Sequence, residues 1–219
     1  MDDEEARRGV QIYNNKRILS SYDFFIIKVR NSLYWRCPSR LMLERYNRFL
    51  SARHLDVGPG SGWYLANARW PHDAQLTLLD LNTVSLSHAS ARLAALHPAT
   101  VVANVLDPLP EDVGPFDSIG LNFVFHCVPG TWAEKGVALR HLADRLTPDG
   151  VLFGSTILGS GVRHNFFGGR IMRLYDQRGV FHNRDDDAAG LETALRRSFS
   201  QVEVEVVGTV ALFWGRRPV

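Results

Sequence analysis

Residues 55–62 have the sequence Leu-Asp-Val-Gly-Pro-Gly-Ser-Gly, in which three glycines alternate with other residues after a short apolar run. Glycine has no Cβ, so it adopts positive φ easily and lets a ligand approach the main chain closely. Residues 63–68 have helical composition, and the first N–H groups of a helix lack intrahelical partners. The stretch predicts a strand, a tight turn and a helix whose main chain can hold a polar small molecule.

The glycine spacing and a nearby acid favour one kind of cofactor over another. Dinucleotide sites use G-x-G-x-x-G, whereas Gly58, Gly60 and Gly62 follow G-x-G-x-G, and Asp56 stands two residues before them. A carboxylate is unfavourable beside a pyrophosphate but suits a cofactor with an ammonium group and no phosphate. The pattern resembles the first motif of the class I S-adenosylmethionine-dependent methyltransferases, and it disfavours an NAD-dependent reductase.

From Arg53 onward the chain alternates between strand-like and helix-like stretches. Repeated βα units predict a parallel sheet flanked by helices. Two β-rich runs at the end, 202–207 and 209–215, have only Gly208 between them, and so short a link joins only antiparallel strands. We expect parallel strands at 53–58, 76–80, 100–103, 117–122 and 151–157, and helices at 84–97, 131–146 and 188–198, with residues 147–150 as a turn.

This order of elements also resembles the methyltransferase fold. The resemblance implies a Rossmann-like α/β fold with a seven-stranded sheet, mostly parallel with a C-terminal antiparallel hairpin, and helices on both faces. The 219 residues are enough for one domain with a sizeable core. We expect the core at 53–219.

Two segments lie outside the βα alternation. Residues 1–52 carry apolar side chains at helical spacing, and we expect an N-terminal helical cap made of helices 13–34 and 39–51, divided at Pro38. An insertion at about 159–187 places aromatic and basic residues between glycines. It is expected to hold a helix near 165–177, and it could act as a lid or simply pack on the sheet edge.

Bulk properties restrict partners and compartment. The formal charge of +2 is too small to imply nucleic acid, and no apolar run reaches the roughly 18 residues that span a bilayer. Residues 1–54 contain more Lys and Arg than Asp and Glu, which indicates either a solvated basic face or a surface that contacts an anionic membrane or an acidic partner. Cys37 and Cys127 lie far apart and suggest buried thiols. We expect a cytoplasmic monomer or homodimer without stable membrane insertion.

Ligands of open α/β sheets bind outside the carboxyl ends of the strands, so residues at strand ends are the candidate cofactor ligands. Asp80 ends the second strand, and its carboxylate can accept both hydroxyls of a ribose. The resemblance assigns Asp80 this role. The alternative is a helix cap facing solvent, although Asn82 could provide the cap instead.

The third and fourth strands end in further candidates. Asn104 stands where the family usually has an Asp that meets the adenine amino group, and its amide oxygen can still accept a hydrogen bond. Asp107 could take this role in a shifted register, or could form a turn before Pro108. The cofactor-binding residues that the resemblance implies are Asp56, Gly58, Gly60, Gly62, Asp80, Leu81, Asn104, Val105, Asn122 and Phe123.

Catalysis of methyl transfer depends mainly on alignment, because the reaction is an in-line displacement at a sulfonium methyl. A base is needed only for a weak nucleophile. His126 is a candidate general base, or equally a packing residue. No metal is expected, since an acidic run such as 185–187 before a helix more often partners its N-terminus.

Aromatic side chains in the N-terminal region and the insertion would suit a flat, mostly apolar acceptor, although each could be ordinary core. The candidates are Tyr22, Phe25, Trp35, His164, Phe167 and Tyr175. The sequence thus predicts a methyltransferase of small aromatic or apolar molecules (O-, N- or C-methylation) in secondary metabolite biosynthesis. A cyclase or isomerase that binds S-adenosylmethionine without transferring methyl, and a binding module without catalysis, are the alternatives.

Overall fold

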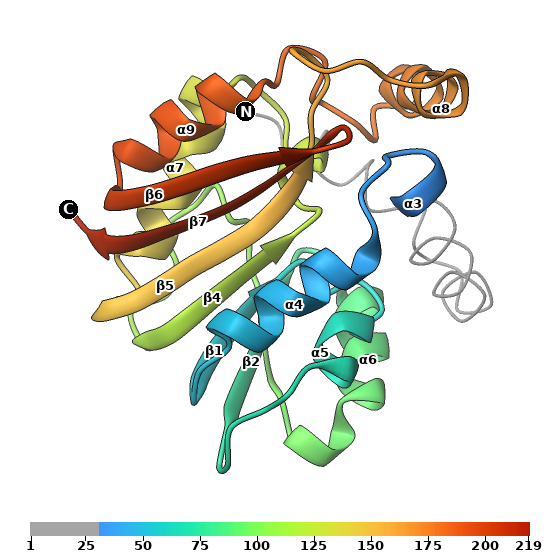
Figure 1. Ribbon diagram of the computed structural model, residues 1–219. Helices are drawn as coiled ribbons and strands as arrows, with labels where there is room; N and C mark the ends of the chain where they lie inside the picture. The colour runs from blue at the N-terminus through green and yellow to red at the C-terminus, as the bar shows by residue number, and fades with distance from the viewer. Residues whose placement is uncertain (1–30) are drawn as a thin grey trace.

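A computed structural model describes residues 31–219 of the chain. Seven strands form one sheet (Figure 1): β1 (Arg53–Val57), β2 (Gln75–Asp80), β3 (Ala99–Val102), β4 (Phe116–Asn122), β5 (Leu146–Ile157), β6 (Phe199–Val207) and β7 (Val210–Pro218). Their order across the sheet is β3-β2-β1-β4-β5-β7-β6. The first five strands pair in parallel, and β7 pairs antiparallel with both β5 and β6. The predicted sheet and C-terminal hairpin are therefore confirmed.

Helices cover both faces of the sheet, as expected. The helices of residues 31–219 are α3 (Asn31–Leu33), α4 (Ser39–Phe49), α5 (Trp63–Asn67), α6 (Thr83–Arg92), α7 (Trp132–Ala143), α8 (Phe166–Gln177) and α9 (Ala188–Arg196), with short 3₁₀ turns at Ala94–Leu96 and Phe125–Cys127. One apolar cluster joins the sheet to α4, α5 and α6, and another joins it to α7 and α9. Because both faces are covered, β1 and β4 are almost continuously buried, as parallel strands usually are.

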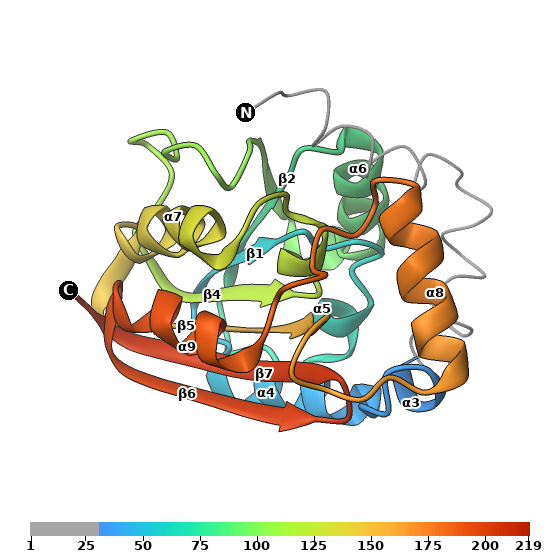
Figure 2. The same ribbon diagram turned by 90° about the horizontal axis from the view of Figure 1, so that it is seen from above.

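The helix α8 stands apart from these two layers. In Figure 2 the arrows of β4 and β5 point toward the end of the sheet at which α8 lies. The insertion therefore lies beyond the carboxyl ends of the parallel strands, where ligands of such sheets bind. No helix in residues 31–219 has the length and apolarity needed to cross a membrane.

The described part of the predicted cap packs into the core. Tyr46 and Phe49 of α4 contact Phe153 of β5, with ring centroids 5.1 and 5.5 Å apart. Both are nearly inaccessible to solvent. Residues 39–49 therefore form a layer of the α/β core rather than a lid over it. Of the helix predicted at 13–34, only its end falls within the described residues.

A second difference concerns the turn predicted at 147–150. These residues lie within β5, where Leu146 pairs with Phe116 and Val151 pairs with Ser118. The additional residues of β5 between these pairs form an irregular bulge. The Pro-Asp-Gly sequence signals a local distortion correctly, but here the chain continues in the same strand. Because β5 already begins at Leu146, α7 ends at Ala143 and not at the predicted Leu146.

Candidate active site

A cavity of about 290 Å³ opens at the carboxyl ends of the parallel strands. It lies where the strand order reverses between β1 and β4, the usual position of a ligand crevice in an open α/β sheet. All ten predicted cofactor residues line it, together with His126. Most of its wall comes from residues 56–65, 79–82, 103–106, 122–124 and 126–129.

The glycine turn after β1 depends on backbone that other residues rarely adopt. Gly58, Gly60 and Gly62 have φ values of 64°, 55° and 71°, in the left-handed region. A Cβ on Gly58 would come within 2.7 Å of Val124, whereas a Cβ on Gly60 would meet no atom within 4 Å. The turn is thus packed at its start and open at its middle, where a ligand can approach the main chain.

Asp56 is almost fully buried and contacts Tyr46 of α4 and His54 of its own strand. Its Oδ2 accepts a hydrogen bond of 2.6 Å from Tyr46 Oη and lies 3.4 Å from His54 Nε2. Burial first, and then the Asp56 carboxylate, raise the pKa of Tyr46 well above its usual value, so its hydroxyl remains a donor. A hydrogen bond also joins Tyr46 to the Asn122 side chain. Tyr46 therefore connects the ends of β1 and β4.

Asp80 lies at the end of β2 and faces the cavity. Its Oδ1 accepts a hydrogen bond of 2.9 Å from the Asn82 N–H. Burial raises the pKa of Asp80 from 3.8 to about 6, although hydrogen bonds from Asn82, Ser85 and Leu81 oppose this shift. The alternative role of Asp80 as the cap of α6 is excluded, because the Asn82 side chain accepts from the Val84 and Ser85 N–H groups.

The loop after β3 brings Asn104 and Val105 to the cavity wall. Asn104 Oδ1 accepts from the Leu106 N–H at 3.0 Å, which fixes the loop and leaves the second lone pair of the oxygen for another donor. Asp107, the alternative in a shifted register, is exposed and does not line the cavity. The loop therefore favours Asn104 over Asp107.

Strain marks the end of β4. Phe123 has φ = 55°, an unfavourable value for an aromatic residue, and its N–H donates to the Ser155 carbonyl oxygen at 2.8 Å. The Ser155 hydroxyl also donates to Asn122 Oδ1 at 2.6 Å. The neighbouring strand β5 thus holds both cavity residues in place.

Beyond the strand ends, one side of the cavity is aromatic. The ring of His126 meets Phe181 at a centroid distance of 4.6 Å and an interplanar angle of 86°, and Phe181 meets Tyr175 at 5.0 Å. Trp35 completes this wall. Burial raises the pKa of the neighbouring Cys127 thiol to about 12, so it remains protonated.

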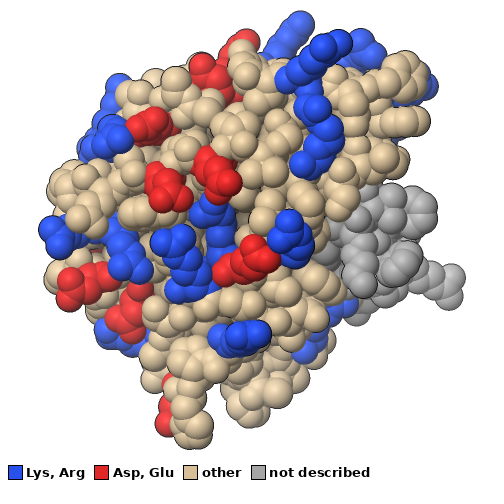
Figure 3. Space-filling model, viewed as in Figure 1, with Lys and Arg blue, Asp and Glu red and all other residues tan. Residues whose placement is uncertain are grey.

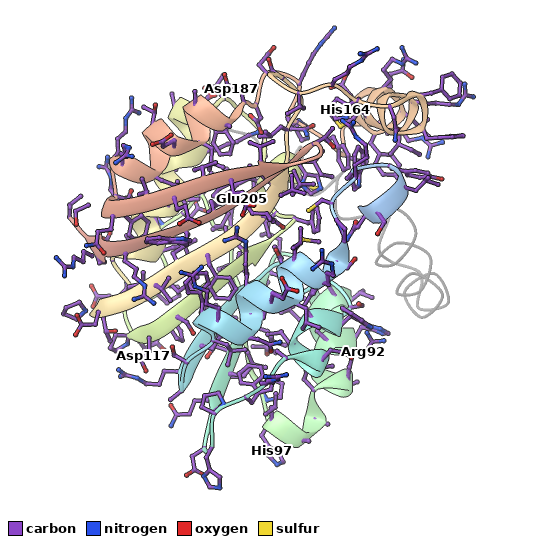
Figure 4. All side chains as sticks on the ribbon, in the orientation of Figure 1. Arg92, His97, Asp117, His164, Asp187 and Glu205 are labelled. Carbon is purple, nitrogen blue, oxygen red and sulfur yellow. The ribbon has the colours of Figure 1, made fainter. Side chains whose placement is uncertain are left out.

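Two predicted acceptor residues do not reach the cavity. His164 Nε2 lies 2.8 Å from the Leu158 carbonyl oxygen, and its ring packs edge-on against Trp35, beside the start of α8 (Figure 4). Phe167 is 53% exposed and stacks on Tyr34. Both predictions are therefore corrected, whereas Trp35 and Tyr175 do line the cavity. Tyr22 and Phe25 lie outside the described residues.

Several residues of the cavity wall were not predicted from the sequence. Tyr46, Tyr64, Ile157 and Phe181 all line the wall. Phe181 carried a usable signal, since it belongs to the aromatic insertion. Tyr46 carried a weaker one, as an aromatic residue on the apolar side of an amphipathic helix.

The acidic run 185–187 has two separate roles. Asp187 caps α9 by accepting from the Gly190 N–H at 2.7 Å, at the start of the helix in Figure 4. Asp186 instead forms a buried ion pair of 2.6 Å with Lys135 Nζ. Within residues 31–219, no group of three or more His, Cys, Asp or Glu side chains could hold a metal ion.

Comparison with known proteins agrees with this geometry. A family model described as a methyltransferase domain matches residues 55–152. The chain is 38% identical over 215 residues to a physcion biosynthesis cluster O-methyltransferase of Aspergillus chevalieri, covering 97% of this chain and 96% of that protein. It is 39% identical over 199 residues to demethylluteothin O-methyltransferase of Streptomyces thioluteus, covering 90% and 86%.

A solved structure shows the same fold. The N-methyltransferase NodS of Bradyrhizobium japonicum, in complex with S-adenosylhomocysteine, superposes with a TM-score of 0.65 at 14% identity, covering 99% of this chain and all of the other. The open glycine turn and the cavity-facing Asp80 carboxylate suit such a nucleoside, which carries hydroxyl and ammonium donors. The chain belongs to the class I S-adenosylmethionine-dependent methyltransferases.

Proposed function

We propose that this enzyme methylates a hydroxyl group of a small, largely apolar aromatic molecule in secondary metabolite biosynthesis. The observation that carries the proposal is the uneven chemistry of the cavity wall. Asp56 and Asp80 are its only Asp, Glu, Lys or Arg residues within the described chain, and both lie on the side of the glycine turn. The opposite side is formed by Trp35, Tyr175 and Phe181, which suits a flat uncharged acceptor. The two relatives named above are both O-methyltransferases.

The cofactor roles follow from the positions of the strand-end residues. Asp80 would accept the ribose hydroxyls, and Asn104 with the Val105 N–H would meet the adenine edge. Asp56, held by Tyr46, and Asn122 would orient the amino-acid end. When bound, S-adenosylmethionine supplies the activated methyl group. The aromatic wall would hold the acceptor in line with that methyl and exclude water.

His126 would accept the proton of the acceptor hydroxyl at a ring nitrogen. It is the only histidine of the cavity wall in the described chain, and it lies next to the aromatic side. A neutral hydroxyl is a weak nucleophile, so removal of this base should lower kcat by about 10²-fold or more. An acidic phenol, which ionises without help, should lose much less.

Product analysis tests this proposal. The purified chain is incubated with S-adenosylmethionine and matched phenols, anilines and carboxylic acids, and products are identified by mass spectrometry. Methyl ethers from phenols support the proposal; methylated amines or acids as the main products contradict it. Turnover of a substrate without S-adenosylhomocysteine would instead identify the cyclase or isomerase alternative.

A His126→Gln variant measured on phenols of different acidity tests the base, with Tyr175→Phe as a control that keeps the aromatic wall. An equal loss for all phenols would mean that His126 only packs. We further propose that the enzyme works in the cytoplasm as a monomer or homodimer. Light scattering of the purified chain would test the oligomeric state, and cell fractionation would test the compartment.

A further inference from the structure

The outer side of α8 combines exposed aromatic and basic residues. Phe166 and Phe167 are 73% and 53% exposed, the largest apolar side chains so placed in residues 31–219. Arg170 and Arg173 follow Phe166 at i+4 and i+7, so they lie on the same side of the helix. The inner side carries Tyr175, which lines the cavity. The helix is therefore both a wall of the site and an outer surface.

A neighbouring segment extends this surface. Leu33, which is 51% exposed, accepts a hydrogen bond of 2.7 Å at its carbonyl oxygen from Asn165 Nδ2. The ring of Tyr34 stacks on Phe167 at 6.0 Å. We call the surface made of Leu33, Arg163, Phe166, Phe167, Arg170 and Arg173 the α8 face.

The positive charge of the α8 face is not neutralised by the described chain. Arg163, Arg170 and Arg173 are all exposed, and no ion pair within residues 31–219 includes them. Asp176, the acid of α8, follows Arg173 at i+3, but no ion pair within residues 31–219 joins it to an arginine of this face. In Figure 3 the upper right of the molecule, over α8 and its loops, shows blue and tan surfaces, and red surfaces on this view lie elsewhere.

This combination is typical of a helix that lies in a lipid interface. Aromatic side chains enter the boundary between headgroups and acyl chains, and arginines pair with anionic headgroups while their stems cover apolar surface. The α8 face is a projecting helix and not a groove, so it fits a deformable lipid surface better than a rigid partner. An acidic protein with a complementary groove is the competing occupant.

We propose that the α8 face docks the enzyme reversibly on an anionic lipid surface. Phe166 and Phe167 enter the interface, and the three arginines contact lipid phosphates or carboxylates. One consequence rests on the proposed function: an apolar acceptor dissolved in the bilayer would be released next to Tyr175 and the aromatic wall. Docking itself does not depend on which acceptor is methylated.

Vesicle co-sedimentation of the full chain tests the proposal. We expect binding to vesicles of phosphatidylcholine with 30% phosphatidylserine, little binding to phosphatidylcholine alone, and weaker binding at high salt because surface charge is screened. Arg170→Gln with Arg173→Gln should weaken partitioning about 30-fold, at roughly 1 kcal/mol per arginine. Phe166→Ser with Phe167→Ser should weaken it roughly tenfold or more.

The matched control changes an exposed apolar and basic pair on another helix, Val137→Ser with Arg140→Gln of α7. It should bind vesicles like the wild type. Affinity for S-adenosylhomocysteine, measured for every variant, shows that each one is folded, because no α8-face residue lines the cavity. Equal binding to neutral and anionic vesicles, no binding at all, or an equal loss in the control overturns the proposal. So does capture by an acidic protein through the α8 face without vesicle binding.

Discussion

Asp80 should make cofactor affinity depend on pH near 6. Burial raises the pKa of its carboxyl from 3.8 to about 6 in the folded chain. The ribose hydroxyls donate hydrogen bonds, so they bind the ionised carboxylate better than the acid. As the pH falls below about 6, Asp80 becomes protonated in the free protein, and the nucleoside can bind well only after this proton is released. The affinity for S-adenosylhomocysteine should then fall by up to about tenfold per pH unit.

The same shift sets the sign of a stability effect. Because the folded-state pKa lies above the unfolded one, the folded chain holds a proton between about pH 4 and 6 that the unfolded chain has released. The free energy of unfolding therefore decreases as pH rises through this window, and the loss is complete above about 6. A shift of about 2 units corresponds to roughly 3 kcal/mol, at 1.36 kcal/mol per unit. Asp80→Asn, which cannot ionise, should be more stable than the wild type at pH 8 and similar to it near pH 4.

Isothermal titration calorimetry with S-adenosylhomocysteine from pH 5 to 8 measures the binding effect, and urea unfolding at matched pH measures stability. Asp80→Asn should bind weakly at every pH and lose the break near 6. If the break persists in this variant, another group causes it. If the variant binds as tightly as the wild type at pH 8, Asp80 is not the ribose ligand.

Three further substitutions, with Gly136→Ala as a control for one of them, test the packing around the site. Tyr46→Phe removes the donor to a buried carboxylate, so urea unfolding should show a loss of about 1.5–3 kcal/mol together with weaker S-adenosylhomocysteine binding; unchanged values for both would exclude a positioning role. Gly154→Ala would place its Cβ 2.1 Å from the Leu121 carbonyl oxygen and should destabilise the folded protein by about 1–3 kcal/mol or more, measured by thermal unfolding. In the control Gly136→Ala, in α7, the new Cβ has its closest contact at 3.4 Å. Thermal unfolding of this control should show an unchanged or higher stability. Lys135→Met leaves its carboxylate partner buried and unpaired and should cost about 3–5 kcal/mol; a melting temperature equal to that of the wild type would contradict this.

Local sequence patterns were sufficient for the fold. Apolar runs separated by helical stretches predicted the parallel strands, and the single Gly208 link predicted the antiparallel hairpin, because a short connection leaves no other geometry. The glycine turn and Asp80 could also be predicted from local sequence. Each belongs to one continuous strand–turn segment whose position in such a sheet is known before the chain folds.

Patterns within the insertion were not sufficient for the acceptor side. His164 and Phe181 belong to the same aromatic segment, yet the first packs behind Trp35 and the second lines the cavity. Composition indicates that aromatic residues are present, but the direction of each ring depends on how α8 and its loops pack against the rest of the protein.

By itself, the sequence determined the succession of strands and helices, the antiparallel pairing of the C-terminal hairpin and the residues at the strand ends, whereas the order of the strands across the sheet came from the structure. Only the tertiary structure decided which distant side chains support those residues, as Tyr46 supports Asp56 and Ser155 supports Asn122. The physical reason is the separation along the chain of the residues that interact. Turns and strands are set by neighbours along the chain, whereas a buried hydrogen bond between two elements exists only where packing brings a donor and an acceptor within about 3 Å.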